Sequence, residues 1–319
     1  MIHFSQAEID RFIDEDLPYH DETTHALGIA GCQGELMFSA KREGFVLCGV
    51  EEAVRIARSL GAEAETAHAS GDWIAPGETF LAMRGRAEAL HRAWKVSLTL
   101  METASGVATR TRAMLDAARA VNPSARIGTT RKAPPGLRKL MFKAVLAGGG
   151  MVHRAGLSET LLVFEQHRAF LPPDEPLAAT LARLHRASPE KKIMIEAETL
   201  DEALRAAEAG ADVVQLEKMA PEALAATVAR LRARHPGLVI SATGGIRLDN
   251  VQAHAACGVD LLVTSHPYHA PPSDIRAAMR PVAEARPEPG FSTAEDVVMK
   301  DARAVLLASD GQCARDRYC

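Results

Sequence analysis

The chain has 319 residues, of which 47% are hydrophobic and 24% are charged, and its formal net charge is −4. This composition suits a globular protein long enough for two domains, and the weak negative charge without a basic run excludes nucleic acid as the main partner. The five cysteines follow no metal-ligand spacing. No apolar run could span a membrane and the acidic N-terminus differs from a signal peptide, so we expect a cytoplasmic protein with no membrane partner.

Residues 1–110 are predicted to form a small α+β domain. Ser5 and Glu8 have the spacing of a capping box ahead of a first helix, and Asp21 is interpreted as another helix cap. Short apolar runs broken by glycine predict strands at 36–38, 45–47 and 80–83, a helix at 50–60 and a turn at 71–79. No chemistry is visible in this domain.

A long helix is expected from residue 87 to residue 120, interrupted at Ser105 and Gly106, and it leads into a second domain over residues 111–270. There the pattern alternates between strands and helices. Strands are predicted at 126–129, 160–164, 193–198, 212–216, 238–242 and 260–264. Helices are predicted between them, at 137–147, 176–187, 200–209, 221–234 and 248–257. Such alternation indicates a parallel sheet.

Polar residues follow nearly every predicted strand of this domain: Arg131, Glu165, Glu198, Glu217, Thr243 and Ser265. A barrel brings the carboxyl ends of all its strands to one point, so the distribution favours a barrel over a doubly wound sheet. The predicted strands are fewer than the eight of a complete barrel. We therefore expect an α/β fold with an open or incomplete TIM-like (β/α) barrel beside the smaller N-terminal α+β domain.

The last part of the chain is expected to return to the first domain. A helix is predicted from residue 274 to residue 285, and residues 271–285 would complete the N-terminal domain. The tail over residues 286–319 begins with two prolines and has little apolar character, and no role is assigned to it.

The central segment of the chain gathers basic side chains at two loops. Arg131 and Lys132 follow a strand-like run, then come a Pro-Pro-Gly turn and an amphipathic helix, and three glycines at 148–150 precede His153 and Arg154. Glycine lets a backbone approach a ligand closely, so this collection suits a polyanion. An exposed basic helix with a glycine C-cap is the alternative.

The same segment resembles the signature of a known family. The sequences TRKAPPGLR (residues 130–138) and KAVLAGGGMVHRAGL (residues 143–157) are similar in order and spacing to the quinolinate phosphoribosyltransferases, type II enzymes that make nicotinate mononucleotide. Weaker similarity extends over residues 21–270, and the chain most resembles the ModD-type pyrophosphorylases associated with molybdenum utilisation. The resemblance implies a pentosyltransferase that uses phosphoribosyl pyrophosphate and forms a homodimer, or a higher homo-oligomer, with shared active sites.

A phosphate site is predicted at Thr243, Gly244 and Gly245, which lie after a strand and before a helix. Backbone N–H groups at such a place bind phosphate. A simple tight turn is the alternative, whereas the resemblance implies the site of a 5′-phosphate.

Carboxylates converge at the ends of two predicted strands. Glu196 and Glu198 share a strand face, and Glu217 ends the next strand. Carboxylates held together repel each other unless a cation joins them, which suggests Mg²⁺ held with pyrophosphate by Glu196 and Glu217. Glu198 is interpreted as a solvated loop residue. By resemblance, Glu196 matches an essential glutamate of the family and Glu217 replaces an aspartate.

The resemblance also implies roles for single residues, with Lys132, Glu196 and Glu217 as catalytic groups. Substrate binding is expected at Lys95, Arg131, His153, Arg154, Phe164, Thr243, Gly244, Gly245, Ser265 and His269. Two of these depart from the family pattern, because Phe164 replaces a lysine and Lys95 replaces an arginine that reaches the partner subunit's site. The pocket has thereby lost one cation and one guanidinium group that can pair with a carboxylate at two points. This change favours an acceptor that is aromatic or carries less charge than quinolinate.

The predicted function is transfer of ribose 5-phosphate from phosphoribosyl pyrophosphate to a pyridine-like acid or a related base. A genuine quinolinate phosphoribosyltransferase of NAD biosynthesis and a non-catalytic nucleotide- or anion-binding protein are the alternatives. The carboxylates favour catalysis, because a phosphate sensor does not need groups that handle a metal. The fold alone does not choose among these functions.

Overall fold

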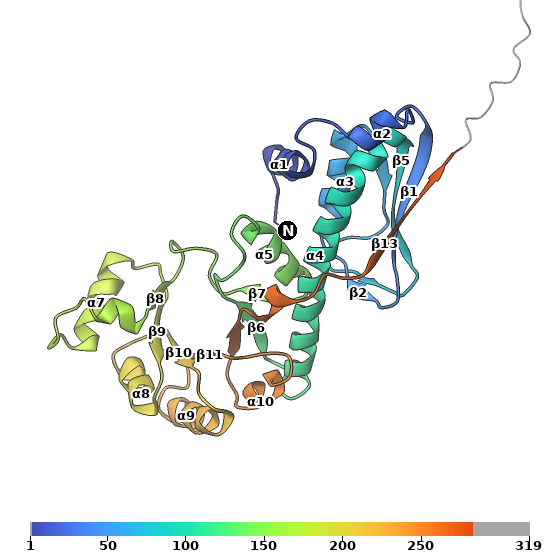
Figure 1. Cartoon of the computed structure of the whole chain (residues 1–319). Helices are drawn as coiled ribbons and strands as arrows, with labels where there is room; N and C mark the ends of the chain where they lie inside the picture. The colour runs from blue at the N-terminus through green and yellow to red at the C-terminus, as the bar shows by residue number, and fades with distance from the viewer. Residues whose placement is uncertain (1, 283–319) are drawn as a thin grey trace, which may run out of the picture. The chain divides into compact units, whose positions relative to one another are not determined.

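The computed structural model describes residues 2–282 (Figure 1). The N-terminal domain contains α1 (Gln6–Asp16), α2 (Glu22–Ala26), β1 (Gln33–Ala40), β2 (Phe45–Val46), α3 (Val50–Ser59), β3 (Glu63–Glu65), β4 (Trp73–Ile74) and β5 (Thr79–Arg86). The capping box is confirmed, since the Ser5 backbone N–H donates to Glu8 at 2.7 Å. Asp21 caps α2 by accepting from the Thr24 N–H at 3.1 Å. The region predicted as a turn contains β4, which pairs with β2.

The helix predicted over residues 274–285 is wrong where the structure describes it. Residues Ile275–Pro281 form β13, which pairs antiparallel with β1 along its whole length. The four-stranded sheet has the order β13-β1-β5-β3, so β13 is an edge strand and the chain does return to complete the N-terminal domain. Residues 283–285 of the predicted helix and the tail over 286–319 lie outside the described residues.

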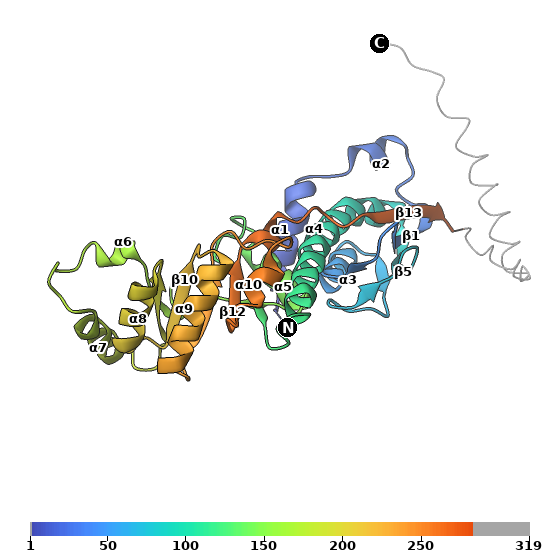
Figure 2. The ribbon, with the colours of Figure 1, turned by 90° about the horizontal axis from the view of Figure 1, so that it is seen from below.

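One long helix, α4 (Ala87–Arg119), serves both halves of the chain (Figures 1 and 2). The predicted interruption at Ser105 and Gly106 is absent, because the helix is continuous. A Cβ on Gly106 would overlap the carbonyl oxygen of Pro271, so glycine is required where the returning chain crosses the helix. Met101 belongs to the first hydrophobic core and Met114 to the second.

The second half of the chain forms the predicted parallel sheet with its covering helices. Its elements are β6 (Arg126–Thr129), α5 (Arg138–Ala147), β7 (Met151–Val152), β8 (Leu161–Val163), α6 (Glu165–Arg168), α7 (Leu177–Ala187), β9 (Ile193–Ala197), α8 (Leu200–Glu208), β10 (Val213–Glu217), α9 (Pro221–Arg234), β11 (Val239–Thr243), α10 (Val251–Ala255), β12 (Leu261–Thr264) and the 3₁₀ turn η1 (His266–His269). The strand β7 and the short α6 are additions to the prediction.

The seven strands have the order β7-β6-β12-β11-β10-β9-β8, and every pairing is parallel. β7 and β8 are the two edges, so the barrel is open, as predicted. Helices α7 to α10 lie along the outer side of the sheet (Figures 1 and 2). Within residues 2–282, no helix is both long and apolar enough to cross a lipid bilayer.

Candidate active site

Strand alternation aims two rows of side chains into the open barrel. The parallel register places Glu196, Gln215 and Ser241 side by side, and the next inward row contains Glu217 and Thr243. Residues paired in register point to the same face of a sheet, and residues two apart on a strand share that face. The carboxyl ends of β9 to β11 therefore present polar groups to one space.

That space is a cavity of about 490 Å³. Besides the inward rows of β9 to β11, it is lined by the loops that follow β6, β7 and β8. Its residues are Thr130, Arg131, Lys132, His153, Arg154, Leu162, Phe164, Glu165, Gln166, Glu196, Glu198, Gln215, Glu217, Lys218, Thr243 and Val263. The structure thus brings together most of the residues predicted to act on substrate.

One wall of the cavity is cationic. Arg131 and Lys132 follow β6, and His153 and Arg154 follow β7, where the His153 N–H continues the ladder by donating to Thr129 at 3.1 Å. Arg154 is only 6% exposed, and its Nε has no hydrogen-bond partner within the described part of the chain. Burial, with the charge of Arg131, lowers the pKa of Arg154. The charge of Glu159 acts in the opposite sense, but no salt bridge pairs this guanidinium among residues 2–282. A buried cation without a salt-bridge partner indicates an anionic ligand.

His153 is the neutral member of this wall. Burial, together with the neighbouring Arg154, lowers its pKa to about 4, so its imidazole carries no charge at neutral pH. Its Nε2 is buried and has no hydrogen-bond partner among residues 2–282. Nε2 can therefore donate a hydrogen bond to a ligand or accept one from it, but the imidazole does not add a positive charge.

The opposite wall is acidic. Glu196 accepts a 3.1 Å hydrogen bond from the Gln215 side-chain amide, and burial and the charge of Glu217 raise the pKa of Glu196. Glu217 is paired with the ammonium of Lys218 at 3.0 Å. Glu198, interpreted from sequence as a solvated loop residue, also lines the cavity.

The predicted phosphate loop follows β11. Thr243 lines the cavity, while Gly244 and Gly245 both have positive φ, at 90° and 70°. A Cβ on Gly245 would meet nothing within 4 Å, whereas one on Gly244 would lie 2.5 Å from Cγ of Lys218. Gly245 thus leaves open space at the loop, as a phosphate site needs, and Gly244 makes room for a side chain.

The three consecutive glycines are not among the residues that line the cavity, and the structure shows a packing role for them. A Cβ on Gly148 would overlap the carbonyl oxygen of Ala108, and one on Gly150 would lie 2.7 Å from Cγ2 of Thr111. Both partners belong to α4. The glycines therefore allow the end of α5 to pack closely on the long helix.

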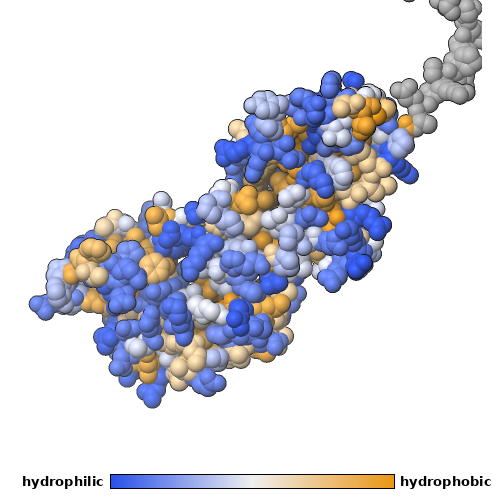
Figure 3. All heavy atoms as spheres, viewed as in Figure 1, coloured by the Kyte–Doolittle hydropathy of each residue, from blue (hydrophilic) through white to orange (hydrophobic). Residues whose placement is uncertain are grey.

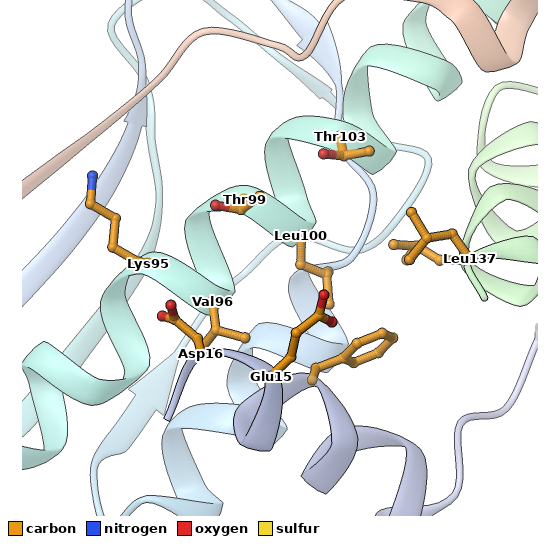
Figure 4. A pocket seen from close by; sticks show the side chains of 10 residues that line it. Glu15, Asp16, Lys95, Val96, Thr99, Leu100, Thr103 and Leu137 are labelled. Atoms are coloured by element: carbon orange, nitrogen blue, oxygen red, sulfur yellow. The ribbon is translucent and has the colours of Figure 1, made fainter. Parts of the chain in front are cut away.

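Lys95, Ser265 and His269 lie outside this cavity within one chain, and Gly244 and Gly245 are not among the residues that line it. Ser265 precedes the 3₁₀ turn η1 and His269 is the last residue of that turn, which is fixed because the Tyr268 hydroxyl donates to Thr129 at 2.8 Å. Lys95 lies 4.5 Å above the ring of Trp94 and lines a different pocket of about 430 Å³ between α1, α4 and α5. Figure 4 shows Lys95 on α4 with Glu15 and Asp16 of α1.

The pocket that contains Lys95 is partly apolar. Figure 3 shows hydrophobic residues gathered in a hollow beside α1 and α4, whereas the barrel half seen in this view is mostly hydrophilic. Phe12 and Leu140 line it beside the acidic end of α1.

Sequence reasoning missed two residues of the acidic wall. Gln215 precedes Glu217 by two positions and therefore shares its face, a signal that strand alternation contains. Lys218 follows the strand directly, and its contact with Glu217 depends on a positive φ of 53° that no pattern indicated. Phe164 was identified, and its ring stacks on His167 with centroids 5.5 Å apart.

The carboxylates are suited to share a metal with a ligand. Among the described residues, no group of three or more His, Cys, Asp or Glu side chains could hold a metal ion by itself. Mg²⁺ in phosphate-transfer sites is commonly held by one or two carboxylates and by substrate phosphates. Glu196 and Glu217 therefore fit Mg²⁺ that arrives with pyrophosphate.

Family models and relatives agree with this architecture. Residues 21–105 match the quinolinate phosphoribosyl transferase N-terminal domain, and residues 107–278 match the C-terminal domain of the same family. The chain is 49% identical to the protein of Rhodobacter capsulatus described as a pyrophosphorylase, ModD, over 75% of this chain and 91% of that one. It is 38% identical to the ModD of Pasteurella multocida, over 86% of this chain and 98% of that one.

The chain is also similar to enzymes named after nicotinate nucleotide. It is 30% identical to the human carboxylating nicotinate-nucleotide pyrophosphorylase, over 80% of this chain and 84% of that one. Two crystal structures share the fold. NadC from Streptococcus pyogenes has a TM-score of 0.78 and 24% sequence identity, over 87% of this chain and 97% of that one. The nicotinate-nucleotide pyrophosphorylase from Ehrlichia chaffeensis has a TM-score of 0.78 and 24% sequence identity, over 88% of this chain and 100% of that one. The chain belongs to the quinolinate phosphoribosyltransferase family.

Proposed function

We propose that the barrel cavity transfers ribose 5-phosphate from phosphoribosyl pyrophosphate to a ring nitrogen of a pyridine-like acid or a related planar base. The observation that carries the proposal is the buried, unpaired Arg154 facing carboxylates across one cavity. The cationic wall suits the phosphates of the donor, and the acidic wall suits the positive charge that develops on the ribose ring. Both charges occur together in a phosphoribosyl transfer, where pyrophosphate leaves as the ribose ring becomes positive.

Each residue then has a chemical task. Arg131, Lys132 and Arg154 hold the pyrophosphate, and the loop at Gly245 receives the 5′-phosphate. The bond from ribose C1′ to the pyrophosphate oxygen breaks while the bond from C1′ to the acceptor nitrogen forms, and pyrophosphate leaves. Lys132 is the cation proposed to stabilise the leaving oxygen. Mg²⁺, held by Glu196 and Glu217 when bound, would supply further neutralisation of the pyrophosphate charge.

The acceptor is proposed to be less acidic than quinolinate. Phe164 presents an aromatic ring where the quinolinate enzymes have a lysine by resemblance, and its backbone precedes Glu165, which adds a negative charge to the cavity lining. A ligand with two carboxylates would leave one of them without a fixed cation. A missing charge-assisted contact worth about 3 kcal/mol reduces turnover by roughly 10². The connection with molybdenum utilisation stays a prediction from the resemblance.

Pyrophosphate release from phosphoribosyl pyrophosphate, measured across a panel of pyridine and purine acceptors, tests the proposal. We expect release with at least one planar monocarboxylate or neutral base, at a rate well above that with quinolinate. Comparable turnover of quinolinate would favour the NAD-biosynthetic alternative. Tight binding of phosphoribosyl pyrophosphate without release for any acceptor would favour a non-catalytic binding protein.

The active site is further proposed to be shared between two subunits of a homodimer. Lys95 lies outside the cavity of its own chain, at a pocket with an apolar hollow, and the resemblance implies that this residue reaches the partner's site. Mixing an inactive Lys95→Ala protein with an inactive Glu196→Ala protein should restore part of the activity, because one hybrid site then has both residues. Subunit exchange without any recovery would contradict a shared site.

A further inference from the structure

Lys218 has a position that ordinary strand geometry does not produce. It follows Glu217 directly, and neighbouring residues on a strand point to opposite faces. Lys218 nevertheless places its ammonium 3.0 Å from a carboxylate oxygen of Glu217. It can do so because its backbone has a φ of 53°, which makes it the one non-glycine residue with positive φ in the part of the chain that the structure describes.

Two further features keep Lys218 in this conformation. Its backbone N–H donates to the carbonyl oxygen of Thr243 at 2.8 Å, which extends the β10–β11 ladder by one residue. Gly244 leaves the space that the side chain crosses, because a Cβ there would lie 2.5 Å from Lys218 Cγ and 2.9 Å from Lys218 N. Backbone strain that its surroundings hold in place is typical of functional sites.

The ammonium faces three carboxylates of the cavity. It is hydrogen-bonded to Glu217, and the charges of Glu198 and Glu196 also act on it from farther away. An exposed lysine side chain is a cation at neutral pH. Glu217 is 16% exposed, and Lys218 keeps 71% of its side chain exposed. The carboxylate is therefore confined while the ammonium is free to move away from it.

We propose that Lys218 is a built-in counter-cation that occupies Glu217 in the empty site, competes there with a divalent cation, and moves to pyrophosphate when that ligand is present. The inference rests on the proposed function, which brings pyrophosphate and Mg²⁺ to these carboxylates. Free metal consequently binds weakly, and metal binds together with pyrophosphate because the phosphate oxygens attract the ammonium away from Glu217. Lys218 is thus a substrate-positioning residue that couples the two ligands.

Replacing the ammonium separates its two effects. In Lys218→Met, titration calorimetry with Mn²⁺ alone should show about tenfold tighter binding than in the wild-type protein, because Glu217 no longer has a competing cation. Titration with inorganic pyrophosphate alone should show about tenfold weaker binding, because a cation is missing. Lys218→Arg should restore pyrophosphate binding. A purely structural role for Lys218 does not produce these opposite signs.

Lys192 provides a matched control. Its side chain is also 71% exposed, and its ammonium is 2.9 Å from Asp212, outside the cavity. Lys192→Met should leave both affinities unchanged. Equal or weaker Mn²⁺ binding in Lys218→Met overturns the proposal, as does unchanged pyrophosphate binding. Neither titration requires turnover, so opposite shifts in an enzyme that releases no pyrophosphate with any acceptor would support Lys218 while the proposed function fails.

Discussion

The two walls of the cavity differ in how their charges are balanced. On the cationic wall, Arg154 is buried and has no salt bridge among the described residues, and His153 is held neutral. On the acidic wall, Glu217 already has its own cation in Lys218, and Glu196 accepts a hydrogen bond from Gln215.

This difference indicates which wall depends on a ligand. A buried charge without a partner destabilises the fold, so the cationic wall is incomplete until an anion binds. The acidic wall is closer to neutral without a ligand and changes partners when one arrives. Substitutions on the first wall should therefore affect binding more than stability, and substitutions around Lys218 should affect both.

The largest effect is expected for Arg154→Met. Loss of the buried guanidinium removes a charge-assisted contact worth about 3 kcal/mol, so affinity for phosphoribosyl pyrophosphate should fall by roughly 100-fold. The free energy of unfolding should stay the same or rise, because the unpaired buried charge is gone. Calorimetric titration and urea denaturation measure the two quantities.

Arg232→Met is the matched control for that variant. Arg232 is 2.6 Å from Asp260 and donates to the carbonyl oxygen of Leu238, on the outer side of the sheet. Its replacement should lower stability and leave ligand affinity unchanged. If Arg154→Met instead lowers stability and keeps the affinity, the cationic wall is structural and the comparison between the walls is wrong.

The acidic wall is tested by its two neighbouring glycines. Gly244→Ala and Gly245→Ala each introduce a Cβ at positive φ, which costs about 1 kcal/mol. Only the first also places that Cβ against Lys218, and such overpacking costs about 1–3 kcal/mol more. In urea denaturation, the free energy of unfolding should therefore be lower for Gly244→Ala than for Gly245→Ala. Equal losses would show that Lys218 moves aside freely.

The sequence predicted the barrel well because its strands are apolar runs between helices with ordinary spacing. It failed where local pattern and long-range pairing disagree. Residues 275–281 were predicted as a helix, but an unpaired edge of β1 makes them a strand. Gly106 suggested a helix break, yet the helix continues, and glycine is needed there because the backbone of Pro271, which is distant in sequence, passes too close for a Cβ.

The site was predictable where a residue ends a strand. Period-two alternation singled out Glu196, and positions at the ends of predicted strands singled out Glu217 and Thr243; all three line the cavity. Lys218 was not predictable, because its orientation comes from a left-handed backbone that depends on Gly244. The contribution of a second subunit also has no signal in the strand pattern of one chain.

A pH effect on stability is expected from the cationic wall. The pKa of His153 is about 4 in the folded protein against 6.5 for the unperturbed group, so the unfolded chain binds more protons between these values. Its contribution to stability is fully present above pH 6.5 and is lost as the pH falls towards 4. His153→Gln should reduce this acid-induced loss by roughly 3 kcal/mol in urea denaturation at several pH values. An unchanged pH profile would mean that the imidazole is solvated.

The smallest expected effect is a change in acceptor selectivity on replacement of Phe164. Phe164 packs against the inner-barrel residues Leu162, Met194 and Val213. A lysine there can keep its aliphatic stem on these residues and extend its ammonium into the cavity, as lysine does on apolar surfaces. Phe164→Lys, combined with Lys95→Arg, should therefore improve turnover of quinolinate by about tenfold, since recovery of about half of the roughly 3 kcal/mol charge contact gives that factor. Phe164→Leu is the control, because it removes the ring without adding charge, and it should leave quinolinate turnover unchanged. An equal improvement in both variants would show that the aromatic ring obstructs quinolinate by its size, and that the charge of this wall does not select the acceptor.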